Sequence, residues 1–295
     1  MLFRKFKYLN TDIVKNLKEI FFIHLKESLK HKISSTLLNA CISFVIVIVI
    51  SSCIVGIFSY EFLYKNLETR TIEANYELLN QFKKTIDDYI LKNIDKISLT
   101  ILQDNSEHSD VMYFFSNKVE GNVAGINNIY NYLQSLKSLN SVIESIAIYY
   151  KNNNMIISSE GVKYLSLPNK PDWIDTDWIN SLYSLTTNYK WLDTRMVRDN
   201  KVLRLGKESN KNVVTFIRKY PQTPSNSNVL GAIAVSISES TLYKTIEDTL
   251  PTDLGQIFVI NKQGTIISHS DDKYLYLNIS NILGNTFTLD KLSEN

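Results

Sequence analysis

The chain has 295 residues, of which 44% are hydrophobic and 21% charged, so it is long enough for one large or two ordinary domains. Residues 1–36 hold eight of the 32 basic residues and three of the 30 acidic ones, a local charge of +5 against −3 for the rest. A basic head on a slightly acidic body does not indicate nucleic-acid binding by the body.

An uncharged segment follows the basic head. Residues 33–60 contain no charged side chain, and residues 42–58 are dominated by Ile, Val, Phe and Ser. The hydrocarbon core of a bilayer is about 30 Å thick and is spanned by about 20 apolar residues in a helix. We therefore predict a transmembrane helix over 37–60. The basic residues before it place segment 1–36 in the cytoplasm and 61–295 outside the cell, with membrane lipid as a partner.

Three other interpretations of this segment fit less well. A cleaved signal peptide usually has a shorter basic head and a shorter apolar run. A buried core helix rarely extends so far without a charge. Ile50-Ser51-Ser52-Cys53 is similar to a lipoprotein cleavage box, but it lies far into the chain and more apolar residues follow it. Cys41 and Cys53 are the only cysteines, so no disulfide or thiolate site is predicted after residue 60.

A long helix is predicted from residue 62 to about 103. Its apolar residues recur at spacings of three and four, which builds one stripe: Phe82, Ile86, Ile90, Ile94, Ile97 and Ile101. The polar cluster Asp104-Asn105-Ser106 ends the pattern. We expect this stripe to pack on the domain that follows the helix in the same chain. The part near the membrane also carries apolar residues such as Leu63 and Leu67, which predicts a homodimer through the long helix.

The next segment alternates helix and strand signals. These predict a helix over 123–140, a hairpin with strands 145–150 and 155–159, a helix carrying Trp178, strands over 190–197, 212–220 and 231–238, and a helix over 240–249. Pro251 follows as a boundary. The order indicates an α+β domain with a five-stranded antiparallel sheet flanked by helices, which together with the long helix forms a unit over 61–250.

The hairpin pattern then repeats. Residues 149–159 read YYKNNNMIISS and residues 259–269 read VINKQGTIISH, with an apolar pair, a polar turn and Ile-Ile-Ser in the same order. We therefore expect a second, similar sheet unit to begin at 251 and to be truncated at 295. The chain is then expected to be the front part of a longer protein.

This arrangement resembles the double Cache sensor regions of bacterial transmembrane receptors. The resemblance covers residues 33–295 and rests on the basic head, the single span, the long helix and two PAS-like units. The amino-terminal stretch is most similar to membrane-bound sensor histidine kinases and AraC-type regulators. The resemblance implies that the first, membrane-distal unit holds a small ligand and that the long helix passes the signal to a cytoplasmic output domain.

The resemblance also bears on the ligand. Relatives that bind amino acids carry an Arg before an aromatic pair, but segment 172–178 reads DWIDTDW and has Asp and Thr where that Arg would stand. We therefore expect a sugar-like molecule rather than an amino acid. The predicted ligand-binding residues are Trp178, Trp191, Asp193, Arg195 and Tyr220. Core packing of the Trp residues and a surface ion pair between Asp193 and Arg195, which alternate on one strand, remain open alternatives.

No enzyme class is indicated. The sequence lacks Gly-x-Ser-x-Gly, His-Glu-x-x-His and a phosphate loop. Only His108 and His269 follow residue 60, far apart in sequence, which speaks against a His-based zinc site. We expect no catalytic residue, metal or cofactor in these residues and no nucleic-acid partner. Two functions remain: a ligand-sensing receptor, or a membrane-anchored module for adhesion or assembly.

Overall fold

The structure of the protein is a computed structural model that describes residues 18–24, 35–103, 109–167, 173–199, 209–223, 228–248 and 257–283. The chain forms two compact units, Met1–Ala74 and Asn75–Asn295. Most of the predicted basic head lies outside the described residues.

The first unit contains the whole predicted span. Helix α2 (Ser35–Thr85) includes residues 37–60. Residues 37–60 belong to the one helix among the described residues that is long and apolar enough to cross a membrane. The most apolar 18 residues of that helix have a mean hydropathy of 2.9, and none of them is buried. The predicted single apolar helix ahead of the sheet domain is therefore confirmed.

The helix changes its winding within the second unit. Helix α2 is followed without a break by a π-helical turn, η1 (Ile86–Leu91), and by α3 (Lys92–Gln103). Phe82, Ile90 and Ile94 are buried. An α-helix has 3.6 residues per turn, so each step of four residues rotates the next side chain by about 40° away from the first. A π turn holds an extra residue and offsets this drift, which keeps the stripe on the domain. The predicted stop at 104–106 lies outside the described residues.

The sheet has six antiparallel strands rather than the predicted five. Its spatial order is β3-β2-β1-β6-β5-β4. The strands are β1 (Ile143–Tyr150), β2 (Met155–Ser158), β3 (Gly161–Tyr164), β4 (Tyr189–Arg198), β5 (Asn210–Tyr220) and β6 (Gly231–Ser238). The strand that the sequence does not reveal is β3, which has four residues including a glycine and a lysine. It is held by pairing with β2 rather than by its own apolar pattern.

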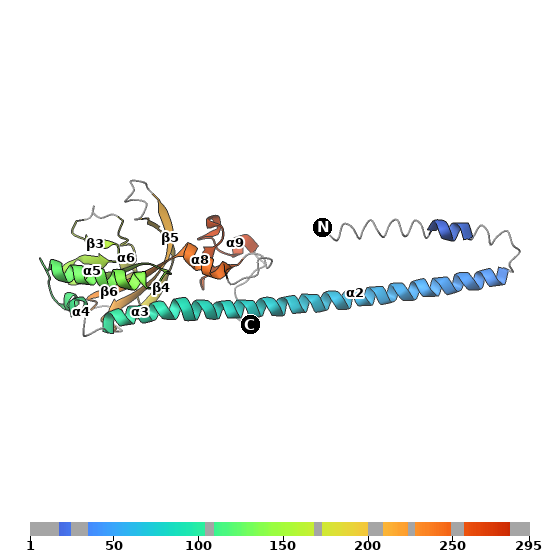
Figure 1. Ribbon diagram of the computed structural model, residues 1–295, viewed down its shortest axis with the longest axis horizontal. Helices are drawn as coiled ribbons and strands as arrows, with labels where there is room; N and C mark the ends of the chain where they lie inside the picture. The colour runs from blue at the N-terminus through green and yellow to red at the C-terminus, as the bar shows by residue number, and fades with distance from the viewer. Residues whose placement is uncertain are drawn as a thin grey trace. The chain divides into compact units, whose positions relative to one another are not determined.

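Helices cover one face of this sheet, which we call the helix face (Figure 1). Helices α4 (Ser109–Ser116) and α5 (Val123–Ser138) pack there together with α3, and α8 (Glu239–Glu247) follows β6. The core between them contains Ile148, Phe216 and Val235 from the sheet. The helix predicted over 123–140 is confirmed as α5, and its Ile126, Ile129 and Leu133 are buried in this core.

The opposite face of the sheet, which we call the roof face, has a smaller core. Side chains of Ala147, Tyr149, Ile217 and Ala234 pack there on α6 (Trp178–Leu182) and on the segment before it. Alternate residues of one strand therefore serve two separate cores, as the period of two in a strand requires.

The repeated hairpin forms as predicted. Strands β7 (Phe258–Ile260) and β8 (Ile266–His269) make a separate two-stranded sheet, followed by η3 (Asp272–Tyr274) and α9 (Ser280–Leu283). The buried Glu239 carboxylate at the start of α8 accepts from Ser268 Oγ at 2.7 Å and from the backbone N–H of His269 at 3.1 Å. Burial raises the pKa of Glu239. The predicted boundary at Pro251 lies outside the described residues, so the division into 61–250 and 251–295 stays a prediction.

Candidate functional site

The sheet separates the three aromatic residues predicted to line one pocket. Trp178 is 1% exposed and belongs to the roof-face core. Trp191 packs edge-on against Phe216, and Tyr220 packs against Phe115, both in the helix-face core. The three rings therefore do not form one wall. The expectation of a sugar-like ligand came from the missing Arg in segment 172–178, and the structure adds no aromatic wall that would support it.

The structure does not support the open alternative of a surface ion pair between Asp193 and Arg195 on one face. The register of β4 against β5 shifts between Leu192 and Arg195, which marks a β-bulge. Because the bulge inserts one extra residue into β4, Asp193 and Arg195 no longer lie on the same face of the sheet. Asp193 accepts a hydrogen bond from Asn261 Nδ2 at 3.0 Å, whereas the Arg195 side chain extends over the roof face.

Arg195 begins a row of polar side chains across the roof face. Its guanidinium donates from Nη1 to Asp175 Oδ1 at 2.8 Å and from Nη2 to Asp175 Oδ2 and to Thr215 Oγ1, the last at 2.9 Å. Thr215 Oγ1 lies 2.9 Å from Ser236 Oγ. Thr215 and Ser236 are opposite each other on β5 and β6, and both are buried. The row therefore runs along the sheet surface that forms the roof face. Such a row offers convergent polar groups inside an apolar surround, as small-molecule sites do.

Asp175 lies in the roof segment, which we define as residues 173–178. Its Oδ1 accepts from the backbone N–H of Asp177 at 3.1 Å, and its carbonyl oxygen accepts from Trp178 Nε1 at 3.1 Å. Lys163 Nζ on β3 donates to the carbonyl of Ile174 at 3.4 Å. The roof segment is thus attached to the sheet through Asp175 and Ile174, and buried Trp178 anchors its end.

Two hollows adjoin these residues. A cavity of about 280 Å³ lies beneath the roof segment and is lined by Lys163, Trp173–Asp177, Met196–Arg198 and Asn210. A wider hollow of about 1,080 Å³ lies along β4 and includes Trp191, Asp193 and Arg195, with apolar side chains such as Ile90, Val214 and Leu242. The structure thus brings three of the five predicted residues around the wider hollow. The smaller cavity has the denser set of charged and polar groups, so it is the stronger candidate for specific recognition.

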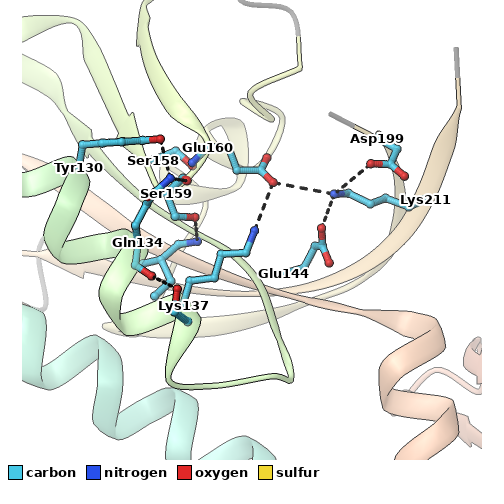
Figure 2. Close-up of polar contacts among 11 residues, drawn as sticks. Tyr130, Gln134, Lys137, Glu144, Ser158, Ser159, Glu160, Asp199 and Lys211 are labelled. Atoms are coloured by element: carbon cyan, nitrogen blue, oxygen red, sulfur yellow. Dashed lines mark hydrogen bonds and ion pairs between the residues drawn. The ribbon is translucent and has the colours of Figure 1, made fainter. Parts of the chain in front are cut away.

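A second charged cluster lies near the ends of β1 and β5 (Figure 2). Lys211 Nζ lies 2.6 Å from Glu144 Oε1, 3.9 Å from Asp199 Oδ1 and 4.0 Å from Glu160 Oε1. Lys137 Nζ on α5 lies 3.6 Å from the same Glu160 oxygen. Ammonium groups occupy the space between the carboxylates, so this cluster joins α5, β1 and the β4–β5 pair rather than forming a ligand site. Within the described ranges, no group of three or more His, Cys, Asp or Glu is arranged to hold a metal ion.

The sequence prediction included Arg195 but missed Lys163, Asp175, Thr215 and Ser236. A usable signal exists for Ser236: β6 reads GAIAVSIS, with small residues alternating with Ile and Val. Small side chains on one face of a central strand leave room above the sheet. Lys163 carried no such signal, because a lysine beside a turn is usually solvated.

A family model described as Cache domain matches residues 63–294. No curated protein sequence matches the chain significantly. The extracellular domain named vpHK1S-Z8, assigned to a histidine kinase, is 13% identical with a TM-score of 0.50, over 73% of this chain and 77% of that one.

Two chemoreceptor domains are also similar. The ligand-binding domain of Pseudomonas fluorescens CtaA, solved with L-serine, is 15% identical with a TM-score of 0.44, over 75% of this chain and 83% of that one. The periplasmic sensory domain of Campylobacter jejuni Tlp1 is 12% identical with a TM-score of 0.44, over 74% and 77%. At these identities the likeness concerns the fold alone.

Proposed function

Since the chain belongs to the Cache domain family, we propose that it is the extracellular ligand-sensing part of a membrane receptor. The observation that carries the proposal is the polar row Asp175, Arg195, Thr215 and Ser236, in which Thr215 and Ser236 are buried and the side chains of Asp175 and Arg195 are 20% exposed. The row ends at Asp175, which lines a cavity together with other residues of the roof segment. Polar groups that converge beside a cavity suit a small ligand that binds there.

The receptor is proposed to be anchored by residues 37–60, with the basic head in the cytoplasm and 61–295 outside the cell. A single apolar helix ahead of a Cache domain supports this arrangement. The output would be a histidine kinase or an AraC-type transcription regulator, and two chains would associate through the long helix. Exposed apolar side chains on that helix, including Leu63, Leu67 and Tyr76, support the association.

The proposed ligand is a small polar molecule held on the roof face. Of the five residues predicted from sequence, Arg195 is proposed to contact it and Trp178 to position the roof segment. Trp191 and Tyr220 pack in the helix-face core, and Asp193 contacts Asn261 beside the wider hollow. The second candidate function, an adhesion or assembly module, would need no such site.

A binding screen tests the sensing function. We expect a small polar compound to raise the Tm of the full chain in detergent micelles. At 100 times Kd, ligand binding stabilises a protein by about 2.7 kcal/mol, which is about 5–10 °C for a domain of this size. The panel consists of amino acids, small carboxylates, sugars and short peptides. Arg195→Met should weaken binding of the hit about tenfold or more, because a hydrogen bond to a charged group is lost.

Trp191→Phe serves as the comparison variant, because Trp191 lines the wider hollow only, whereas Arg195 lines that hollow and also pairs with Asp175 of the roof segment. A hit weakened by Trp191→Phe would place the ligand in the wider hollow and contradict the site, whether or not Arg195→Met weakens it too. A panel without any hit would favour the adhesion module.

Cysteine labelling tests the membrane topology. In a variant with Cys41 and Cys53 replaced by alanine, Leu139→Cys should react with a membrane-impermeant maleimide in intact cells, because Leu139 is 81% exposed and the proposed topology places it outside the cell. Ser28→Cys should react only after the membrane is permeabilised. Labelling of Ser28→Cys alone in intact cells would show the opposite orientation.

A further inference from the structure

Residues 18–24 form a short helix whose apolar side chains are uncovered within the described part of the chain. Every side chain of this helix, which is the dark-blue helix in Figure 1, is exposed. Four in succession are large and apolar, with exposed fractions of 58%, 53%, 73% and 61%: Ile20, Phe21, Phe22 and Ile23. We call these four residues the apolar patch. Single exposed apolar residues are ordinary, but a contiguous set marks an interaction surface.

The sequence around the apolar patch is basic. Residues 15–32 carry a net charge of +3 from five lysines and two glutamates: Lys15, Lys18, Lys26, Lys30, Lys32, Glu19 and Glu27. Exposed Phe and Ile among lysines are typical of segments that lie on an anionic membrane surface. The apolar side chains enter the boundary between headgroups and acyl chains, and the ammonium groups stay in the headgroup layer. A nucleic acid would use the lysines but would leave the apolar patch in water.

The helix is too short to cross a membrane. Its seven residues extend about 10 Å at 1.5 Å per residue, whereas the hydrocarbon core of a bilayer is about 30 Å thick. Charged residues also bound the apolar patch, with Glu19 directly before it and Lys26 shortly after it. A short apolar helix between charges therefore suits the plane of the bilayer surface rather than its interior.

The chain itself keeps the apolar patch close to a bilayer. Residues 25–34 connect it to α2, which begins at Ser35 and contains the segment predicted to span the membrane. Ten residues reach at most about 35 Å when fully extended. Such a short tether gives the bilayer surface a high effective concentration at the apolar patch, so a weak affinity for lipid is sufficient for docking.

A second copy of the chain fits the apolar patch less well. Successive residues of an α-helix are about 100° apart, so four in succession point around the helix, whereas paired helices use apolar residues spaced by three and four. The basic segments of two copies would also repel each other. A headgroup layer surrounds a short helix on several sides, and anionic lipids supply the opposite charge.

We propose that residues 18–24 dock on an anionic phospholipid surface, in the leaflet on the amino-terminal side of the span. Phe21 and Phe22 enter the boundary between headgroups and acyl chains, and Lys18 and Lys26 contact lipid phosphates. In the proposed topology this is the cytoplasmic leaflet, which has a negative surface potential. The docked helix gives the chain a second membrane contact ahead of α2. This role goes beyond the sensing function and does not depend on it.

A fluorescent label tests the docking. With Cys41 and Cys53 replaced by alanine, the full chain carrying Phe22→Cys is labelled with a polarity-sensitive nitrobenzoxadiazole dye and reconstituted into nanodiscs. We expect the emission to shift to shorter wavelength in discs of equal parts phosphatidylcholine and phosphatidylglycerol, compared with discs of phosphatidylcholine alone. A lipid with a nitroxide at the top of its acyl chain should quench the label in the mixed discs. The same label on Leu139→Cys, at a position that is 81% exposed in the sheet domain, should show neither change.

Variants separate the contributions of charge and apolar insertion. Each lysine near an anionic surface contributes about fivefold to binding, so Lys26→Gln with Lys30→Gln should lower the ratio of docked to free label about twentyfold. Lys118→Gln with Lys151→Gln removes the same charge from exposed lysines of the sheet domain and should leave this ratio unchanged. Phe21→Ser should lower it about tenfold, because it removes a large apolar side chain from the docked surface.

The outcomes decide between a bilayer and other partners. Equal spectra in the two kinds of disc, or quenching that persists with Lys26→Gln and Lys30→Gln, would overturn the assignment to anionic lipid. A shift to shorter wavelength without quenching by the nitroxide lipid would show that protein covers the apolar patch, and the inference would be wrong. Undiminished quenching of Phe21→Ser would exclude apolar insertion. The ligand screen of the sensing function is independent of each of these results.

Discussion

Replacement of Gly231 by alanine is expected to abolish cooperative folding of the six-stranded sheet. A Cβ at this position would lie 2.0 Å from the backbone oxygen of Tyr149 and 2.7 Å from Cε1 of Phe115. The first atom belongs to β1, which pairs with β6, so it cannot move without breaking the ladder in the middle of the sheet. The close approach therefore requires a residue without a side chain.

Thermal unfolding of the full chain, followed by circular dichroism, checks this expectation. Gly121→Ala is the matched control: nothing lies within 4 Å of its Cβ, and its φ of +80° costs an alanine about 1–2 kcal/mol. Gly121→Ala should thus fold with a slightly lower Tm. A Gly231→Ala variant that unfolds near the wild-type Tm would show that β1 and β6 can separate locally at this point.

Asp95→Ala is expected to have the next largest effect, because it leaves a buried guanidinium without its carboxylate. Arg218 on β5 has a side chain that is 4% exposed, and it pairs with Asp95 on α3, which is 43% exposed. Its Nε donates to Ser98 Oγ at 2.9 Å, and its guanidinium lies 5.0 Å from the centre of the Tyr189 ring. Burial lowers the pKa of Arg218, and Asp95 opposes that shift.

Removing one partner of a fully buried pair costs about 3–5 kcal/mol. Solvent reaches Asp95, so we expect about 2 kcal/mol and a fall in Tm of about 4–8 °C. The control is Asp88→Ala, which removes the carboxylate of an exposed pair with Lys92 at 2.6 Å near the same end of the helix. That change should not alter the Tm measurably. Equal losses in the two variants would show that Arg218 does not depend on Asp95.

Much of the fold could be predicted from the sequence, because its main signals are local. The apolar runs of β1, β5 and β6 indicate strands, which the structure buries on both faces, and the spacing of Ile126, Ile129 and Leu133 in α5 marks a surface that faces a core. Strand β3 escaped prediction because its position depends on pairing with β2 rather than on its own residues. The bulge in β4 escaped for a similar reason. Asp193 and Thr194 carry no sequence signal for a bulge, yet the bulge at these residues moves Arg195 to the roof face.

The site was less predictable than the fold because it depends on which face each side chain occupies. Trp178, Trp191 and Tyr220 are all aromatic residues of the kind that line ligand pockets, but they lie on opposite faces of the sheet. Lys163 and Trp173 come together only through the roof segment, whose course depends on the contacts of Asp175 and Ile174. Such long-range placement is not encoded in any short window of residues.

The π-helical turn Ile86–Leu91 has a consequence for comparing this chain with others. Because the turn holds one residue more than an α-helical turn, a relative with an uninterrupted α-helix will be one residue shorter here. Alignments of the long helix should therefore place a single-residue gap within 86–91. Without that gap, every residue on one side of the turn is matched to a neighbour about 100° away around the helix axis, and the buried stripe of one protein falls on an exposed face of the other.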